Sequence, residues 1–533
     1  MAVLTRDVDE GLDDGGPPDA GRRRVSRGRG ALSGFLGAGA ALLVIELVSL
    51  VDATAVTVTG AVQNRFIADF AASLKQTAID LFGRNDKVAL QLGTAVVVLL
   101  IGAAVGAFAV DRWRIVVGAF AAFAVLGIVL ALGDPLAPGA LSVAAAVLGA
   151  VVGAAVVVGL ERRWRRPLAE GRGTASGLAA ADRRQVLTQG GLAALALLVG
   201  ATAVRGARSS MRHVRTVAGR VLPRPVRRVT VPASQPFHVE GLSPFVTPTG
   251  DFYRIDISPE APVVDADGWE VAITGRVDKE LRFSYDDLLA RDLIEVPITM
   301  QCVSNEVGGD LIGTARWTGI PLATLLREAG VKAGADQVVA EAVDGFTAGF
   351  PIEAALDGRQ ALLVVGMNGH PLTTEHGFPA RLVVPGLYGY VSATKWLKEI
   401  RLTTFGEEQG FWIPRGWARL GPIKTQSRID VPAPGAKVSV GRNAIAGVAW
   451  APTRGIKRVE VSIDDGPWQR AELGRVTTAD TWVQWRLAWD ATAGDHTIAV
   501  RATDGKGKVQ TASPAPPDPD GATGHDTIAV AVA

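Results

Sequence analysis

The chain has 533 residues, 48% of them apolar, and a formal charge of +2 at neutral pH. Because this length exceeds what one compact core accommodates, more than one domain is expected. The nearly balanced charge gives no support for nucleic acid as a partner. The single cysteine, Cys302, excludes an intrachain disulfide framework. Residues from about 31 to 205 are rich in Ala, Val, Leu and Gly, whereas the remainder has the composition of a globular protein.

Five apolar runs in the N-terminal part are about long enough to cross a bilayer. They cover residues 31–51, 89–110, 115–132, 139–160 and 188–204. Buried core helices explain this pattern poorly, because the runs recur and carry little charge. We therefore predict a disordered basic tail over residues 1–30 and an α-helical membrane bundle over residues 31–205. The segment "NRFIADFAASLKQTAIDLFG" between the first two runs has helical periodicity. It is expected to lie on the outer membrane surface or to pack as an extracellular helix.

Basic segments flank these runs on one side only. "GRRRVSRGRG", "DRWR" and "ERRWRR" all fall on the same side if the chain crosses five times. The positive-inside rule assigns that side to the cytoplasm. We expect a multi-pass cell-membrane protein with a cytoplasmic N-terminus and extracytoplasmic C-terminal domains. The pair Arg183 and Arg184, before the last run, resembles a twin-arginine export signal, for which ordinary positive-inside charge is the alternative.

Two features bear on a function for the bundle itself. Glu46 is the exceptional carboxylate within an apolar run, either a functional group or part of a helix contact. No histidine occurs in the first 205 residues, which excludes bis-histidine haem ligation there. A transporter regulated by the C-terminal part is a third functional hypothesis, disfavoured by the scarcity of ionisable residues in the runs.

The C-terminal part predicts a linker and two further domains. Residues 206–235 are basic and contain proline, as in a tether. Residues 236–430 mix strand-like and helix-like segments, which predicts an α+β domain; Ser284 and Asp287 have the spacing of a helix capping box. Residues 431–533 alternate polar and apolar positions between Gly and Asp turns, as in an antiparallel immunoglobulin-like β-sandwich. The tryptophans expected in its core or an interface are Trp468, Trp482, Trp485 and Trp489.

Three roles for Cys302 compete on the residues alone. It could be a buried apolar residue. It could be a catalytic nucleophile with His370 or His376 as base, although no nucleophile motif surrounds it. It could also be a soft thiolate ligand for a metal. Spacing does not decide among the three.

The surroundings of Cys302 resemble the sulfite oxidase family of molybdenum enzymes. The similarity rests on "TMQCVSNEVGG", "GTARWTGIPL" and "MNGHPLTTEHGFPARLVVPGLYGYVSATKWLKEI", in that order. It covers roughly residues 236–533. It implies that Cys302 is the thiolate ligand of a molybdenum ion that also binds the dithiolene of one molybdopterin. The residues that it implies for cofactor binding are Tyr253, Arg254, Cys302, Thr347, His376, Arg381, Thr394 and Lys395.

The sequence departs from the family pattern near the expected substrate site. Glu306 and Val307 stand where sulfite oxidases carry basic residues, and Phe346 stands where they place a tyrosine. Arg316 is retained and is expected to face an anionic substrate in a catalytic role. Loss of a cation and a phenol weakens the case for sulfite and favours a neutral or larger substrate, such as a sulfoxide.

The resemblance implies an oxidoreductase that moves an oxygen atom to or from a small molecule. The sequence contains no C-x-x-C-H haem motif, so electrons are expected to pass to or from another protein or the quinone pool. The family's sandwich domain forms homodimers, which implies a possible homodimer here. The alternative is a binding or structural protein on a degenerate scaffold without metal, and the departures at Glu306, Val307 and Phe346 keep it open.

Overall fold

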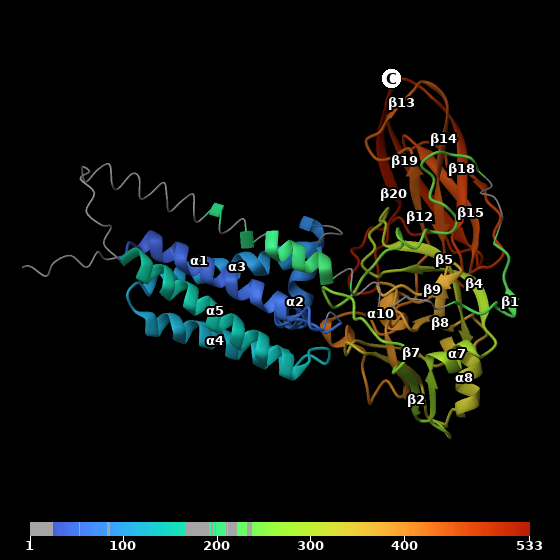
Figure 1. The fold of residues 1–533 in the computed structure, drawn as a ribbon. Helices are drawn as coiled ribbons and strands as arrows, with labels where there is room; N and C mark the ends of the chain where they lie inside the picture. Colours follow the sequence, from blue (N-terminus) through green and yellow to red (C-terminus); the bar gives the residue numbers. More distant parts are fainter. Residues whose placement is uncertain are drawn as a thin grey trace, which may run out of the picture.

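The computed structural model describes most of the chain, and all structural statements below refer to its described residues. These are residues 25–52, 54–82, 86–165, 191–192, 196–197, 199–208, 211, 221–231 and 237–533. A helical bundle stands beside two β-rich bodies, and the C-terminus lies at the far tip of the second body (Figure 1).

The N-terminal body consists of long helices. Their bounds are α1 Arg27–Val48, α2 Val58–Phe82, α3 Asp86–Phe108, α4 Trp113–Leu132 and α5 Gly139–Arg165. Four helices could span a membrane by length and composition: Arg27–Val48, Ala89–Phe108, Trp113–Leu132 and Gly139–Arg165. They lie within a few residues of the first four predicted runs. In the fifth predicted run, residues 191–192, 196–197 and 199–204 are described and helical, whereas the rest of that run and the Arg183–Arg184 pair fall outside the described residues.

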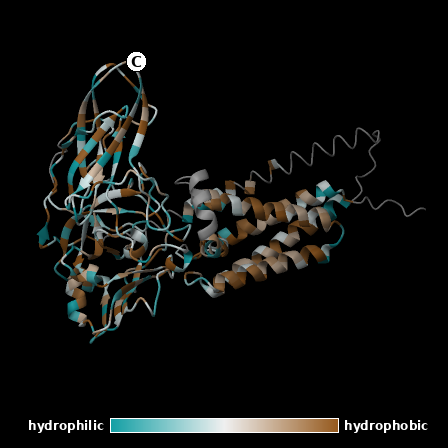
Figure 2. Ribbon diagram, turned by 180° about the vertical axis from the view of Figure 1, so that it is seen from behind, coloured by the Kyte–Doolittle hydropathy of each residue, from teal (hydrophilic) through white to brown (hydrophobic). Residues whose placement is uncertain are grey.

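Glycines allow α1 and α3 to pack closely. A methyl group added at Gly34 would lie 1.9 Å from the carbonyl oxygen of Gly102, and one added at Gly30 would lie 2.3 Å from that of Gly106. In a lipid bilayer the hydrophobic effect does not drive helices together, so helix association depends on close packing. Small residues at such contacts let the helix backbones approach each other closely. The outer faces are apolar, with Leu100 62% exposed, which suits contact with lipid (Figure 2).

The middle body contains two sheets. One has the order β1-β4-β5-β8-β10, with β9 paired to β8, and the other has the order β3-β2-β11-β6-β7. The strand bounds are β1 Arg227–Arg228, β2 Glu270–Gly275, β3 Leu281–Ser284, β4 Ile294–Gln301, β5 Ile312–Pro321, β6 Gln337–Ala342, β7 Thr347–Pro351, β8 Leu362–Met367, β9 His370–Pro371, β10 Arg381–Val383 and β11 Leu397–Thr403. The short helices are α7 Tyr285–Leu289, α8 Leu322–Ala329, α9 Glu353–Leu356, α10 Gly389–Ser392 and the 3-10 helix η2 Ile413–Arg415. The mixture confirms the predicted α+β class.

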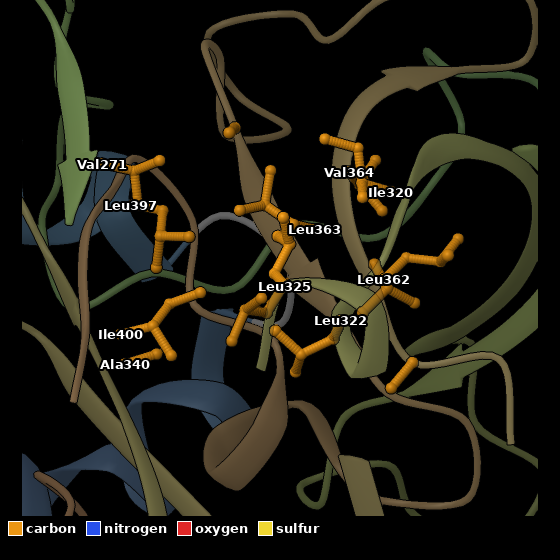
Figure 3. Close-up of a cluster of buried hydrophobic side chains, with 14 of the residues drawn as sticks. Val271, Ile320, Leu322, Leu325, Ala340, Leu362, Leu363, Val364, Leu397 and Ile400 are labelled. Atoms are coloured by element: carbon orange, nitrogen blue, oxygen red, sulfur yellow. The ribbon is translucent and has the colours of Figure 1, made fainter. Parts of the chain in front are cut away.

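The core of this body lies between its two sheets. Ile320 of β5 and Leu363 of β8 share a buried cluster with Val271 of β2 and Leu397 of β11, and α8 adds Leu325 (Figure 3). Burial of each such side chain stabilises the fold by about 1.5–3 kcal/mol. The predicted capping box is present at α7, where Ser284 and Asp287 exchange side-chain and backbone hydrogen bonds.

The C-terminal body is a β-sandwich, as predicted. Its sheets have the orders β12-β14-β18-β17 and β13-β20-β19-β15-β16. The strands are β12 Gln426–Val431, β13 Lys437–Val438, β14 Gly441–Trp450, β15 Ile456–Ile463, β16 Gln469–Arg470, β17 Glu472–Leu473, β18 Val483–Ala491, β19 Gly494–Asp504 and β20 Asp526–Val532. Trp482, Trp485 and Trp489 are buried, which confirms their predicted packing role, and Trp468 is half-buried against the Arg501 guanidinium.

The helical bundle contacts the middle body at two places. The Nε and Nη2 atoms of Arg415 donate to the carbonyl oxygen of Ala68 on α2, at 3.3 and 3.2 Å. The buried Arg208 forms an ion pair with Glu260 at 3.2 Å and also donates to the carbonyl oxygen of Ala55. Charged side chains therefore tie the bundle to two segments of the middle body, one that follows β11 and one that precedes β2.

Substitution of Arg415 by Ala should loosen this junction. Hydrogen bonds from a charged donor contribute about 1.5–3 kcal/mol, so amide exchange on α2 near Ala68 should accelerate by about 10-fold or more. Hydrogen–deuterium exchange measures this directly. Arg419→Ala is the matched control, since its guanidinium packs on Phe405 within the same body. Equal exchange in the two variants would show that Arg415 does not hold the junction.

Candidate active site around Cys302

Cys302 sits in a tight turn directly after the buried strand β4. Its N–H donates to the carbonyl oxygen of Leu311 at 2.9 Å, and its own carbonyl oxygen accepts from the N–H of Asn305 at 3.1 Å. The N–H of Ser304 donates to Cys302 Sγ at 3.4 Å. The side chain is 7% exposed. The thiol is therefore held in one position by the backbone around it.

The β-sandwich braces the residue before this turn. Gln301 donates from Nε2 to Gln426 Oε1 at 2.8 Å, and its Oε1 accepts from Trp450 Nε1 at 2.9 Å. Arg428, on β12, donates to the carbonyl oxygen of Gly309 at 2.8 Å. The second domain therefore fixes the strand and loop that carry Cys302.

Cys302 lines a cavity of about 870 Å³, a volume that includes its open mouth. The lining brings together distant segments, including Tyr253, His376, Arg381 and Lys395. Five of the eight residues that the sequence implied for cofactor binding, Cys302 among them, thus meet at one cavity.

Arg381 is buried and lies inside the cavity wall. Its Nη1 donates to the carbonyl oxygen of His376 at 3.1 Å, and its guanidinium stacks 5.1 Å from the ring of Trp317. Burial lowers the pKa of Arg381 to about 10. Its Nε is buried without a hydrogen-bond partner. An anionic or acceptor-rich ligand would satisfy this donor.

Lys395 forms a second cationic position in the lining. Its Nζ pairs with the fully buried carboxylate of Asp256 and donates to the carbonyl oxygen of Glu375 at 3.0 Å. The other oxygen of Asp256 accepts from Arg254 Nε at 2.6 Å. Asp256 thus joins the two basic residues and orients both.

His376 has a defined tautomer. Its Nε2 lies 2.8 Å from the carbonyl oxygen of Thr249, which can only accept, so Nε2 carries the hydrogen. Burial lowers the pKa of His376 to about 4, which keeps the ring neutral near pH 7. Nδ1 is then an acceptor. Tyr253 stacks on Phe252 with ring centroids 5.2 Å apart, and burial raises the pKa of its phenol.

The donor set fits a molybdopterin. The heterocycle and phosphate of a pterin present many acceptors, and the cavity offers guanidinium, ammonium and phenol donors beside one soft thiolate. Among the described residues, no group of three or more His, Cys, Asp and Glu side chains could hold a metal. A metal at Cys302 would therefore take its other ligands from an organic cofactor.

Three of the eight residues implied for cofactor binding lie outside the cavity lining. Arg254 lines a neighbouring polar cavity of about 880 Å³, a volume that likewise includes its open mouth, together with Arg208, and its Nη2 is buried without a hydrogen-bond partner. The hydroxyl of Thr394 lies 3.5 Å from the carbonyl oxygen of Ala340. The carbonyl oxygen of Thr347, on β7, accepts from the N–H of Phe411.

The structure does not bring Arg316 to the cavity either. It lies on β5 opposite Pro297, well before Cys302 in the β4–β5 ladder, and its Nη2 donates to the carbonyl oxygen of Asn368 at 3.4 Å. Strand register separates Arg316 from the thiol, so the expected contact with substrate has no support from this geometry.

Sequence reasoning missed several lining residues. Asp344 occupies the turn between β6 and β7, and Trp412 and Trp417 lie on the segment around η2. Tyr390 is the second residue of α10 and donates to the carbonyl oxygen of Ala418. A weak signal for the tryptophans existed in "FWIPRGW", where two large aromatic residues flank a Pro-containing turn. Nothing local distinguished Asp344 from an ordinary turn aspartate.

Comparison with known protein families assigns the two β-rich bodies. Residues 258–412 match the oxidoreductase molybdopterin binding domain, and residues 426–500 match a bacterial Ig domain. The first match covers most of the cavity lining.

Characterised relatives include sulfite oxidases. The human mitochondrial enzyme is 30% identical over 348 residues, which cover 55% of this chain and 63% of the relative. The Arabidopsis thaliana enzyme is 29% identical, with 52% and 87% covered. The chain thus spans less than two thirds of the human enzyme's length. The uncharacterized oxidoreductase YuiH of Bacillus subtilis is 34% identical over 157 residues, with 30% and 76% covered.

Among solved structures, the sulfane dehydrogenase SoxCD from Paracoccus pantotrophus is 28% identical in sequence. The matched region covers 50% of this chain and 75% of the SoxCD chain, with a TM-score of 0.45. The family match and the sequence relatives show an enzyme, and they support a molybdenum–molybdopterin cofactor. This answers the alternative of a non-catalytic scaffold. The chain therefore belongs to the sulfite oxidase-like family of molybdopterin-dependent oxidoreductases.

Proposed function

We propose that this protein is a membrane-anchored, extracytoplasmic molybdenum enzyme that transfers an oxygen atom to or from a small sulfur compound. Cys302 supplies the protein thiolate to the metal. Tyr253, His376, Arg381 and Lys395 hold the pterin, with Arg254 at its margin. The cofactor supplies two-electron oxygen-atom transfer, and the protein positions the substrate and controls charge around it.

The placement of charge on the bundle supports the proposed orientation. Arg29 of α1 stacks 6.0 Å from Trp164 of α5, and Arg165 of α5 pairs with Asp111 at 2.5 Å. These basic segments therefore meet at one end of the bundle. Figure 2 shows hydrophilic residues gathered at the bundle end that lies away from the catalytic domain. With that end in the cytoplasm, the catalytic domain lies outside.

The charge of the cavity supports a neutral substrate. Its lining carries two carboxylates, Asp256 and Asp344, against two strong cations, Arg381 and Lys395. Lys395 is paired with Asp256, and Arg381 is buried against Trp317. Addition of an anionic cofactor would leave a site that repels sulfite. The remaining wall, with Phe346, Trp412 and Trp417, suits an apolar sulfoxide or thioether, and this charge balance is the observation that carries the substrate proposal.

The electron partner is proposed to be separate from this chain. All six histidines lie beyond residue 205, and the single cysteine cannot form a C-x-x-C-H haem motif. We propose that a carrier protein or a quinone exchanges electrons with the site. Homodimerisation through the β-sandwich stays a prediction. The domain limits predicted from the sequence also stay predictions.

Substrate preference tests the proposal. The full chain, loaded with cofactor, should reduce dimethyl sulfoxide with a reduced viologen dye at a kcat/KM about 10-fold or more above that for sulfite oxidation. A tenfold preference corresponds to about 1.4 kcal/mol of transition-state binding. Stopped-flow absorbance of the dye measures the first rate, and ferricyanide reduction measures the second. Faster oxidation of sulfite would contradict the proposed substrate class.

A further inference from the structure

We propose that Asp344 is the proton donor and acceptor for the oxygen atom transferred in the Cys302 cavity. This inference rests on the proposed function. Release of the oxygen as water requires two protons: a sulfoxide, two electrons and two protons give a thioether and water. The sulfur–oxygen bond breaks and two oxygen–hydrogen bonds form, with the electrons coming from a reduced carrier. The structure must therefore place an exchangeable proton at the cavity.

Asp344 is positioned to serve this step. It occupies the turn between β6 and β7 and lines the same cavity as Cys302. Oδ2 lies 3.4 Å from the hydroxyl of Ser258, and Oδ1 accepts from the N–H of Phe346 at 3.1 Å. The residue is half-buried and its neighbour Gly345 is exposed, so the turn connects the cavity with solvent. A proton given to the substrate oxygen can therefore be replaced from outside.

The charged groups around Asp344 come from two other segments. Asp256 and Ser258 lie on the loop before β2, and Lys395 lies before β11. Burial raises the pKa of Asp344 to about 6; the negative charge of Asp256 adds to the rise, while the N–H of Phe346 and the charge of Lys395 oppose it. A group with this pKa exchanges its proton readily near neutral pH.

Four other ionisable groups in the described cavity lining, Tyr253, Tyr390, His376 and Asp256, are poorly suited to the task. Burial raises the pKa of both Tyr253 and Tyr390, so these phenols retain their protons. His376 stays neutral and donates its one ring hydrogen to the carbonyl oxygen of Thr249. The two oxygens of Asp256 are taken by Arg254 and Lys395.

The first test observes the proton itself in the full chain. Infrared difference spectra, recorded as pH is raised, should show loss of a protonated carboxyl signal with a midpoint near pH 6 in the wild type. Asp344→Asn should abolish this signal. Asp357→Asn, which removes a carboxylate ion-paired to Arg359 outside the cavity, should retain it. A midpoint for Asp344 near the ordinary value of about 3.9 would overturn the proposal.

The second test uses sulfoxide reduction by the cofactor-loaded protein. For a donor with raised pKa, the wild-type kcat should be highest below pH 6 and fall about tenfold per pH unit above it. Asp344→Asn should lower kcat by roughly 10²-fold, remove this pH limb and leave KM nearly unchanged. Asp344→Glu should recover part of the rate. An unchanged pH profile in Asp344→Asn, at equal molybdenum content, would overturn the proposal.

The experiments distinguish failure of the proposed substrate class from failure of the proposed role of Asp344. If the wild type oxidises sulfite and does not reduce sulfoxide, the proposed substrate class fails. The role of Asp344 is then tested in the direction of oxidation, where its carboxylate must accept a proton. The rate should in that case rise through pH 6 in the wild type and lose this dependence in Asp344→Asn.

Discussion

Replacement of Cys302 by Ala should abolish oxygen-atom transfer while the fold survives. The thiol occupies one fixed position, with its Sγ 3.4 Å from the N–H of Ser304 and 7% of the residue exposed. Removal of a group that hydrogen-bonds to a metal ligand typically lowers metal affinity or activity by roughly 10–100-fold. Removal of the ligand itself should therefore lower activity by more than this. Truncation to Ala removes one buried sulfur and should lower the free energy of unfolding by only about 1–2 kcal/mol.

Spectroscopy distinguishes a ligand from a packed residue. Molybdenum X-ray absorption of Cys302→Ala should show one sulfur ligand fewer than the wild type, with the pterin still bound. Met300→Leu is the matched control, because Met300 lines the same cavity and this exchange conserves volume. An active Cys302→Ala variant would show that the cysteine only packs.

Substitution of Arg381 by Met should prevent cofactor retention without unfolding the protein. In the described residues Arg381 forms no ion pair with a carboxylate, and its hydrogen bonds go to the backbone carbonyl oxygens of His376 and Ala393 and to Met300 Sδ. A buried cation that pairs directly with no carboxylate is costly, and burial already lowers the pKa of Arg381 to about 10. The apo variant should therefore be at least as stable as the apo wild type, whereas its molybdenum and pterin content should fall by about 10-fold or more.

Two measurements, the stability of the apo protein and its cofactor content after expression, test this prediction. Thermal unfolding of the apo proteins reports stability, and metal analysis after expression with cofactor reports retention. Arg291→Met serves as control, since Arg291 forms a bidentate pair with Glu328 at 2.7 and 3.0 Å and lies outside the cavity lining. Full cofactor content in Arg381→Met would exclude a role for this guanidinium in binding the pterin.

Local sequence patterns predicted the helices, strands and helix cap whose formation depends on residues close together in the sequence. Apolar runs located four helices within a few residues, because a bilayer-length run of this kind has few other stable conformations. Alternation located the sandwich strands, and the Ser284–Asp287 spacing located the start of α7. The residues around Cys302 singled it out as a candidate metal ligand; the structure places it in the lining of the cavity, and its role as a ligand stays a prediction.

Features that depend on register and long-range packing were not predictable in this way. Arg316 lies on β5 opposite Pro297, several residues away from Cys302 along the β4–β5 ladder, and only the strand pairing reveals this. Asp344 reaches the cavity because the β6–β7 turn meets the loop that carries Asp256 and Ser258, which are far away in sequence. The bracing of Gln301 by Gln426 and Trp450 likewise joins two domains.

The molybdenum and pterin content of the purified full chain tests the central claim most directly. The protein should be produced in a host that makes molybdopterin and then analysed for metal and for oxidised pterin. A cavity built around Cys302, Arg381 and Lys395 predicts close to one molybdenum and one pterin per chain. Folded protein that contains neither, made with the cofactor available, would contradict the assignment of this cavity as a molybdenum site.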